Sequence, residues 1–179
     1  MNILGHSIDD EIELSIVKVS DAQALFDLID SSRERLGRWL GFVADTLQPS
    51  DVEAFIAAVR KAYAAEESYT FAIRFRGQVA GIVSVVVSAV QNSGEIGYWI
   101  GADFEGKGVV TKAVRAVTEF AFEELRLHRV AIYVAVPNER SANVAMRAGF
   151  RFEGVLRGAA RVGDTYYDAK VFALLAADA

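Results

Sequence analysis

The sequence predicts an α/β fold of the α+β kind, in which helices flank a mixed, mostly antiparallel central sheet. Two hairpin patterns, at 69–90 and 150–175, place strands directly after one another. Between them, residues 94–100 alternate as a strand does and continue through a glycine-rich turn into a helical pattern that begins near Gly108. The chain of 179 residues suits one domain, 1–179, which can bury a core without disulfides or a structural metal.

The first third of the chain is expected to form one strand and then helices. Residues 11–19 alternate between apolar and polar positions, and Ser20 or Asp21 can cap the helix that follows. Ser50 and Glu53 have the spacing of a capping box, which predicts that another helix begins there. The remaining expected elements are a helix at 33–40, strands at 69–75, 79–90, 94–100, 129–136, 150–157 and 165–175, and a short helix from Asn138 to Ala148.

The glycine-rich turn at 106–108 predicts an anion site, because the first amides of the following helix have no partners within the helix and face this turn. A P-loop is a weaker interpretation, since Gly108 stands where that motif needs a hydroxyl for magnesium. The dinucleotide fingerprint also fits poorly, because Thr111 replaces its third glycine. A turn that merely joins strand to helix is the remaining alternative.

Composition excludes several classes of protein. The chain has no cysteine, which rules out a thiol nucleophile and a cysteine zinc site, and His6 and His128 lie too far apart to suggest a metal site. The net charge of −5 argues against a nucleic-acid surface. No signal peptide is evident, and the longest apolar run, 79–90, is too short to span a bilayer. A cytoplasmic protein that binds neither membrane nor nucleic acid is therefore expected.

Four segments then occur in a characteristic order. They are IGYWI at 96–100, FEGKGVVTKA at 104–113, VPNERSANVAMRAGFRFEGVLR at 136–157 and GDTYYD at 163–168. Together with the order of the elements, these segments resemble the GNAT N-acetyltransferases, and within that superfamily the RimJ/RimL type that acetylates protein N-termini. The resemblance covers most of the chain and implies the GNAT acyl-CoA N-acyltransferase fold.

The resemblance implies acetyl-CoA as the cosubstrate. Its pyrophosphate would lie on the loop amides, its pantetheine arm would run beside the strand end, and an asparagine at the start of the short helix would contact it. The residues implied for this role are Trp99, Ile100, Glu105, Gly106, Lys107, Gly108, Val109, Val110 and Asn138.

Glu105 departs from the loop pattern of the family, Q/R-x-x-G-x-G/A, in which the first position is Gln or Arg. A carboxylate beside a pyrophosphate should repel it. If the side chain points away, the backbone amides and Lys107 could still hold the anion, with lowered affinity. Val110 adds bulk where the pattern has Gly or Ala, which a helix start tolerates.

Acetyl transfer to an amine needs few side chains. Glu95 is the candidate base, directly or through a water, and its alternatives are an exposed strand carboxylate or a partner of Arg129. Ser141 matches the serine that RimL-type enzymes are thought to use as the acid for the departing thiolate, and its alternative is a helix-start serine that satisfies a backbone amide. Tyr133 is a rival acid.

The fold of the family also implies how the two substrates meet. A splay between the strands ending at Ile100 and Val136 would leave unpaired amides facing the thioester carbonyl. Trp39, Phe42 and Tyr69 would line the acceptor cleft, unless they are simply core residues.

The sequence is thus interpreted as an N-acetyltransferase in which an amine attacks acetyl-CoA directly in a ternary complex. The expected acceptor is the α-amine of a protein N-terminus, of the ribosomal-protein Ser or Ala type. The alternatives are an acetyltransferase of a small-molecule amine and a non-catalytic module that binds or senses acetyl-CoA. A homodimer is left open.

Overall fold

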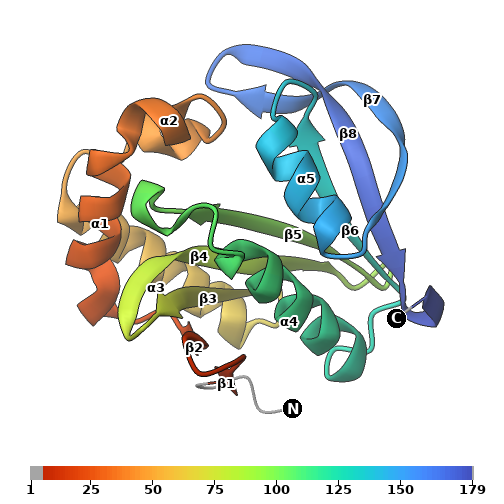
Figure 1. Ribbon diagram of the computed structural model, residues 1–179, viewed down its shortest axis with the longest axis horizontal. Coiled ribbons are helices and arrows are strands. Elements are labelled where there is room, and N and C mark those ends of the chain that lie inside the picture. Colours follow the sequence, from red (N-terminus) through yellow and green to blue (C-terminus); the bar gives the residue numbers. More distant parts are fainter. Residues whose placement is uncertain (1–5, 179) are drawn as a thin grey trace.

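The computed structural model describes residues 6–178, which form an eight-stranded sheet with helices on both faces (Figure 1). The strand order is β1-β2-β3-β4-β5-β6-β8-β7. All neighbouring strands are antiparallel except β5 and β6, which are parallel. The strands are β1 (His6–Ser7), β2 (Ile12–Ile16), β3 (Ser68–Phe75), β4 (Gln78–Ser88), β5 (Ser93–Ile100), β6 (Arg129–Ala135), β7 (Arg151–Val162) and β8 (Thr165–Leu175). The prediction of a mixed, mostly antiparallel sheet is confirmed.

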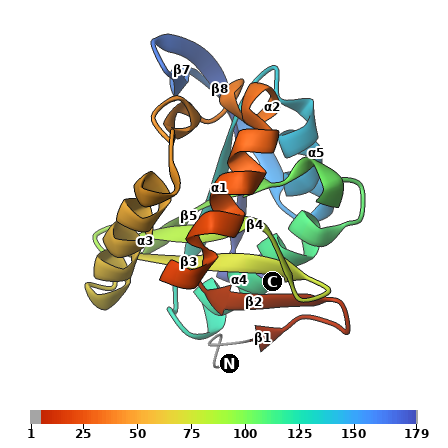
Figure 2. The ribbon, with the colours of Figure 1, turned by 90° about the vertical axis from the view of Figure 1, so that its left-hand side faces the viewer.

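Helices α1 and α3 cover one face of the sheet, and α4 and α5 cover the other (Figures 1 and 2). None of the helices in residues 6–178 is long and apolar enough to cross a membrane. The helices are α1 (Ala22–Ser31), α2 (Arg33–Gly37), α3 (Pro49–Ala64), α4 (Val109–Glu123) and α5 (Glu139–Arg147), with short 3₁₀ turns η1 (Val19–Asp21), η2 (Gly41–Ala44), η3 (Ala102–Phe104) and η4 (Ala176–Asp178).

Alternation along the strands divides the apolar residues between two cores. Leu14, Phe71 and Ile96 pack with the buried stripe of α4 in the larger core. Ala72 and Trp99 belong to the smaller core, which packs against α1 and α3. Because successive strand residues point to opposite faces, the neighbouring strands β3, β4 and β5 contribute to both layers.

The parallel pair β5–β6 is joined over only three residue pairs, from Ser93–Arg129 to Glu95–Ala131. Beyond this point the two strands diverge, as Figure 1 shows. Among residues 6–178, the edge of 96–100 that faces β6 therefore has no strand partner. This opening in the middle of the sheet is the splay expected from the resemblance.

The start of helix α3 differs from the sequence prediction. Helix α3 begins at Pro49 rather than near Ser50, with Gln48 as its N-cap, and Asp51 rather than Glu53 closes the capping box. The Asp51 carboxylate accepts a hydrogen bond from the Gln48 amide at 3.0 Å. The prediction was wrong because proline is favoured at the first helical position, which moves the N-cap two residues earlier, from Ser50 to Gln48.

Asp21 lies at the N-cap of α1, but its carboxylate does not cap that helix. It accepts hydrogen bonds from the Lys18 amide at 2.9 Å and from the Arg74 guanidinium at 2.6 Å. A buried carboxylate needs such partners, and Asp21 is only 4% exposed. The side chain therefore ties the start of α1 to strand β3.

Candidate active site

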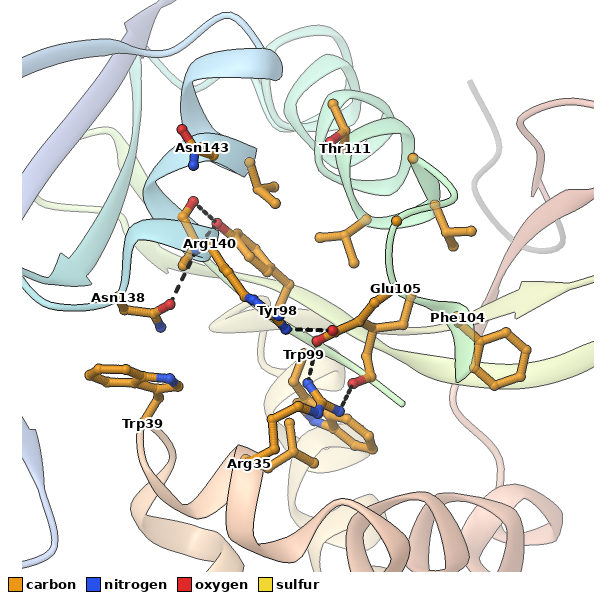
Figure 3. A pocket seen from close by; sticks show the side chains of 18 of the residues that line it. Arg35, Trp39, Tyr98, Trp99, Phe104, Glu105, Thr111, Asn138, Arg140 and Asn143 are labelled. Carbon is orange, nitrogen blue, oxygen red and sulfur yellow. Dashed lines mark hydrogen bonds and ion pairs between the residues drawn. The ribbon is translucent and has the colours of Figure 1, made fainter. Parts of the chain in front are cut away.

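A cavity of about 820 Å³ lies where the end of β5, the start of α4, the first turns of α5 and helix α2 meet (Figure 3). Most of the predicted site residues line it, although they come from three separate segments of the chain. Those residues are Trp99, Ile100, Glu105, Gly106, Gly108, Val109, Val110, Asn138 and Ser141. Lys107 and Glu95 do not line this cavity.

The loop before α4 offers a row of free amides to the cavity. Gly106 and Gly108 both have φ of +74°, a left-handed conformation that glycine adopts readily. Within the described chain, the amides of residues 106–111 donate to no protein acceptor, and the first helical hydrogen bond runs from Lys112 N to Gly108 O at 3.1 Å. These amides and the positive end of the α4 dipole suit an anionic group.

The side chains of the cavity add positive charge. Arg35, Arg140 and Arg147 line it, whereas Glu105 is its single carboxylate. The donor set and the net positive lining fit the diphosphate of a coenzyme A ester, which the loop amides would hold, with the acyl-bearing arm directed along the open edge of β5.

The sequence showed a carboxylate, Glu105, in the anion-binding loop and no partner for it. In the structure this carboxylate has two partners. One of its oxygens accepts a hydrogen bond from Arg35 Nη1 at 2.6 Å, and the other accepts one from Arg140 Nη1 at 2.7 Å. Arg35 also donates from Nη2 to the Ile100 carbonyl at 2.7 Å. The negative charge is thus matched by two arginines from α2 and α5 (Figure 3).

Lys107 is directed away from the other loop residues. Its Nζ lies 5.4 Å from the ring centroid of Phe75 and 5.8 Å from that of Phe104. These cation–π contacts anchor the loop to the neighbouring strand. The structure therefore gives Lys107 a place beside the cavity wall rather than inside it.

Ser141 and Asn138 meet at the start of α5. The Asn138 side chain caps the helix by accepting a hydrogen bond from the Ser141 amide at 3.2 Å. The Ser141 hydroxyl lies 2.9 Å from the Tyr98 hydroxyl, which also donates to the Ser141 carbonyl at 3.0 Å. Since the single phenolic proton is used by that carbonyl, the serine hydroxyl donates to Tyr98 in this arrangement.

Tyr98 is a site residue that sequence reasoning missed. Burial raises the pKa of Tyr98 to about 12, with the hydrogen bond to Ser141 acting in the opposite direction. The phenol consequently stays protonated at physiological pH and holds Ser141 in the cavity wall. The signal was present in the alternation of β5, which puts Tyr98 on the same face as Ile100.

Glu95 lies in a separate hollow of about 250 Å³, over the paired end of β5 and β6. Desolvation there raises the pKa of the Glu95 carboxyl, although the residue remains exposed. Arg129 lines the same hollow but pairs with Glu153, with Nη1 2.7 Å from Oε1, so it is not the partner of Glu95. Tyr133 also lies in this hollow and not beside Ser141.

The three aromatic residues proposed for the acceptor cleft have different positions. Trp39 lines the main cavity, and its ring lies 6.3 Å from that of Tyr167 in the terminal hairpin. The ring of Phe42 lies 6.4 Å from that of Trp99. Tyr69 is 8% exposed and belongs to the larger core, where it packs edge-on against other rings, so of the two alternatives for Tyr69 the core position is the one observed.

The three cavity arginines were also missed by the sequence analysis. Arg140 and Arg147 lie within the motif segment of α5, where their spacing could have been noticed. Arg35 had no local signal, because its proximity to Glu105 joins residues 70 positions apart in the chain.

Comparison with known proteins gives this arrangement a family. The family described as "Acetyltransferase (GNAT) domain" matches residues 12–151. The chain therefore belongs to the GNAT acetyltransferases and is an acetyl-CoA-dependent N-acetyltransferase.

Two curated bacterial proteins are similar over nearly their whole length. The protein named "Putative ribosomal N-acetyltransferase YdaF" of Bacillus subtilis (strain 168) is 37% identical, with 94% of this chain and 93% of that protein covered. The ribosomal-protein-serine acetyltransferase of Escherichia coli (strain K12) is 25% identical, with 93% of each covered. Among solved structures, the Microcin C7 self immunity acetyltransferase MccE, in complex with acetyl-CoA and AMP, has a TM-score of 0.91 and 29% identity, with 96% of each chain covered.

Proposed function

We propose that this N-acetyltransferase transfers the acetyl group of acetyl-CoA to the α-amine of a protein N-terminus. The observation that carries the proposal is the opening between β5 and β6. Different functional groups lie on the two sides of the sheet at this opening. The free amides of the α4 loop and Ser141 lie on one side. Glu95 projects toward the other side, which it shares with Trp99 and the smaller core.

On this proposal the loop residues act as the cosubstrate cradle. The amides of residues 106–111 and the α4 dipole hold the diphosphate, and Asn138 fixes the start of α5 beside it. Trp99 and Ile100 line the wall along which the acyl-bearing arm would run. Acetyl-CoA supplies the thioester that the amine attacks.

The two proposed catalytic groups transfer protons, one at the attacking nitrogen of the amine and one at the departing sulfur of coenzyme A. Glu95, with its raised pKa, takes a proton from the incoming ammonium directly or through a water. Ser141 gives a proton to the departing thiolate, and Tyr98 holds the serine hydroxyl in place through their shared hydrogen bond. The open edge of Ile96–Ile100 provides the backbone donors for the developing oxyanion.

An α-amine is a better-matched acceptor than a lysine side chain. With ordinary pKa values, roughly one α-amine in seven is neutral at pH 7, against about one lysine in 2,500. A single partly desolvated carboxylate suits the easier deprotonation. The names of the two curated relatives support a ribosomal protein as the acceptor, and the second name adds serine. The acceptor on this proposal begins with Ser or Ala.

The acceptor is tested by competition. A peptide with a free Ser or Ala terminus is mixed with the same peptide blocked at its N-terminus and carrying an internal lysine, and mass spectrometry locates the acetyl group. We expect acetylation of the free terminus. Preferential labelling of lysine would refute the proposal, and faster turnover of a polyamine than of either peptide would move the acceptor to small-molecule amines.

Three further features complete the proposal. The chain acts as one domain, which the continuous sheet supports. It works in the cytoplasm, where ribosomal proteins are made. A homodimer is supported by β7, the free edge of the sheet, on which Phe152, Val155 and Leu156 are exposed. Sedimentation at micromolar concentration would test the dimer.

A further inference from the structure

Glu105 joins three elements that meet only in the folded chain. It belongs to the loop before α4, Arg35 belongs to α2 and Arg140 belongs to the first turn of α5. Figure 3 shows the two guanidinium groups converging on the carboxylate at the mouth of the cavity. The loop amides that suit a diphosphate begin at the next residue, Gly106.

The two arginines are held very differently. The Arg35 side chain is 30% exposed and is fixed by a second hydrogen bond, to the Ile100 carbonyl. The Arg140 side chain is 79% exposed, and in the described part of the chain Glu105 is its only polar partner. Arg140 can therefore leave the carboxylate at little cost, because an exposed ion pair contributes little to stability. Arg35 stays and keeps Glu105 neutralised.

We propose that Arg140 binds the diphosphate of acetyl-CoA, and that Glu105 holds this arginine at the mouth of the cavity until the cosubstrate arrives. A diphosphate on the loop amides lies beside the carboxylate and competes with it for Arg140. The guanidinium can offer the phosphates two parallel hydrogen bonds, which a single contact with Glu105 does not use. Arg35 remains on the carboxylate during this exchange and limits its repulsion of the phosphates.

This inference rests on the proposed function and assigns a side chain to its cosubstrate. It makes opposite predictions for the two partners. Arg140→Gln should weaken acetyl-CoA binding by about tenfold, since hydrogen bonds between charged groups are strong but this one is partly solvated. Glu105→Gln should tighten binding, because it removes both the competitor for Arg140 and the repulsion. It should also raise the KM for the acceptor. Helix α2 loses its ion pair with the loop in this variant, and Trp39, which lines the cavity, directly follows that helix.

The test is a calorimetric titration of acetyl-CoA into the parent protein, the two single variants and the double variant. Arg38→Gln is the matched control, because Arg38 is similarly exposed at 66%, pairs with Glu34 and lies outside the cavity lining. We expect a loss of affinity for Arg140→Gln, no change for Arg38→Gln, and a smaller gain from Glu105→Gln when Arg140 is already replaced. Thermal melts would confirm that all variants are folded.

The results distinguish failure of the Arg140 inference from failure of the proposed function. If the parent binds acetyl-CoA and Arg140→Gln binds it equally well, the role of Arg140 is refuted while the function stands. If the parent does not bind, both are refuted. A parallel titration with 3′-dephospho-acetyl-CoA identifies the phosphate. A loss of the same size supports the diphosphate, and a loss that disappears assigns Arg140 to the 3′-phosphate and overturns the inference.

Discussion

At the scale of single residues, the two proposed catalytic groups are separated by the sheet itself. Glu95 and Tyr98 are three positions apart on β5, so their side chains point to opposite faces. Tyr98 contacts Ser141 on the α5 side, whereas Glu95 lies in the hollow with Ala131 and Tyr133. A thioester in the opening between β5 and β6 would have a base on one face and an acid on the other.

Glu95→Gln tests the base. Because only the carboxylate can accept a proton and desolvation raises its pKa, parent kcat should fall as the pH drops through a value above the ordinary 4.5. The variant should lose about 10²-fold or more in kcat and show no such fall, since a positioned base typically contributes 10²–10⁴-fold. The measurement is a pH profile of kcat at saturating substrates. A variant with parental kcat and an unchanged profile would exclude Glu95.

Ser141→Ala tests the acid. It should lower kcat by about 10²-fold with little change in the Kd of acetyl-CoA, because the proton reaches the thiolate only during turnover. The backbone amide of residue 141 still donates its hydrogen bond to the Asn138 side chain in this variant, so the start of α5 is kept. Ser141→Thr retains the hydroxyl and should recover part of the rate. Unchanged turnover of the alanine variant would point to another proton donor.

At the scale of elements, helix α4 forms the proposed cosubstrate end of the site. Its buried stripe, which includes Val114, Val117 and Ala121, fixes the helix on the sheet. The left-handed turn at Gly108 then leaves the first amides free to face the cavity. Packing of the helix body and conformation of the glycine loop are therefore separate requirements, and they can be tested separately.

Gly108→Val should weaken acetyl-CoA binding by more than tenfold, because a β-branched residue cannot keep the left-handed turn that orients the amides. Gly77→Val is a matched control. Gly77 has φ of +77° against +74° for Gly108, and an added Cβ meets nothing within 4 Å at either position. Both variants should lose similar stability, roughly 1–2 kcal/mol. Calorimetry should show reduced affinity only for Gly108→Val, and an equal loss in both would remove the loop from the site.

The accuracy of the predicted helix starts depended on how many capping residues lie near each start. The prediction that a short helix starts at Asn138 was confirmed, because its side chain accepts a hydrogen bond from an amide in the first turn of α5. The Ser50 prediction was wrong because a proline and two other polar residues nearby offered a competing start. The local sequence predicts a helix start correctly when it contains one candidate capping residue. It fails when several candidates lie within one helical turn.

At the scale of the whole molecule, the proposed mechanism uses an interruption in the sheet. Most strands pair along their length, but β5 and β6 separate after three residue pairs. Helices α4 and α5 line the cavity on one side of the opening, and the hairpin of β7 and β8 meets the α2 region near Trp39 and Tyr167. On the proposed mechanism, the two substrates of the acetyl transfer approach this opening from different sides of the sheet.

The sequence by itself determined the order of the elements, the glycine loop before α4, the capped start of α5 and the acetyltransferase family. These features are carried by residues close together in the chain, whose periodicity and backbone preferences are local. Only the tertiary structure decided that Glu105 pairs with Arg35 and Arg140, that Tyr98 contacts Ser141, that Lys107 turns toward Phe75 and that Tyr69 belongs to the core. Each of these depends on contacts between distant segments, which no local pattern encodes.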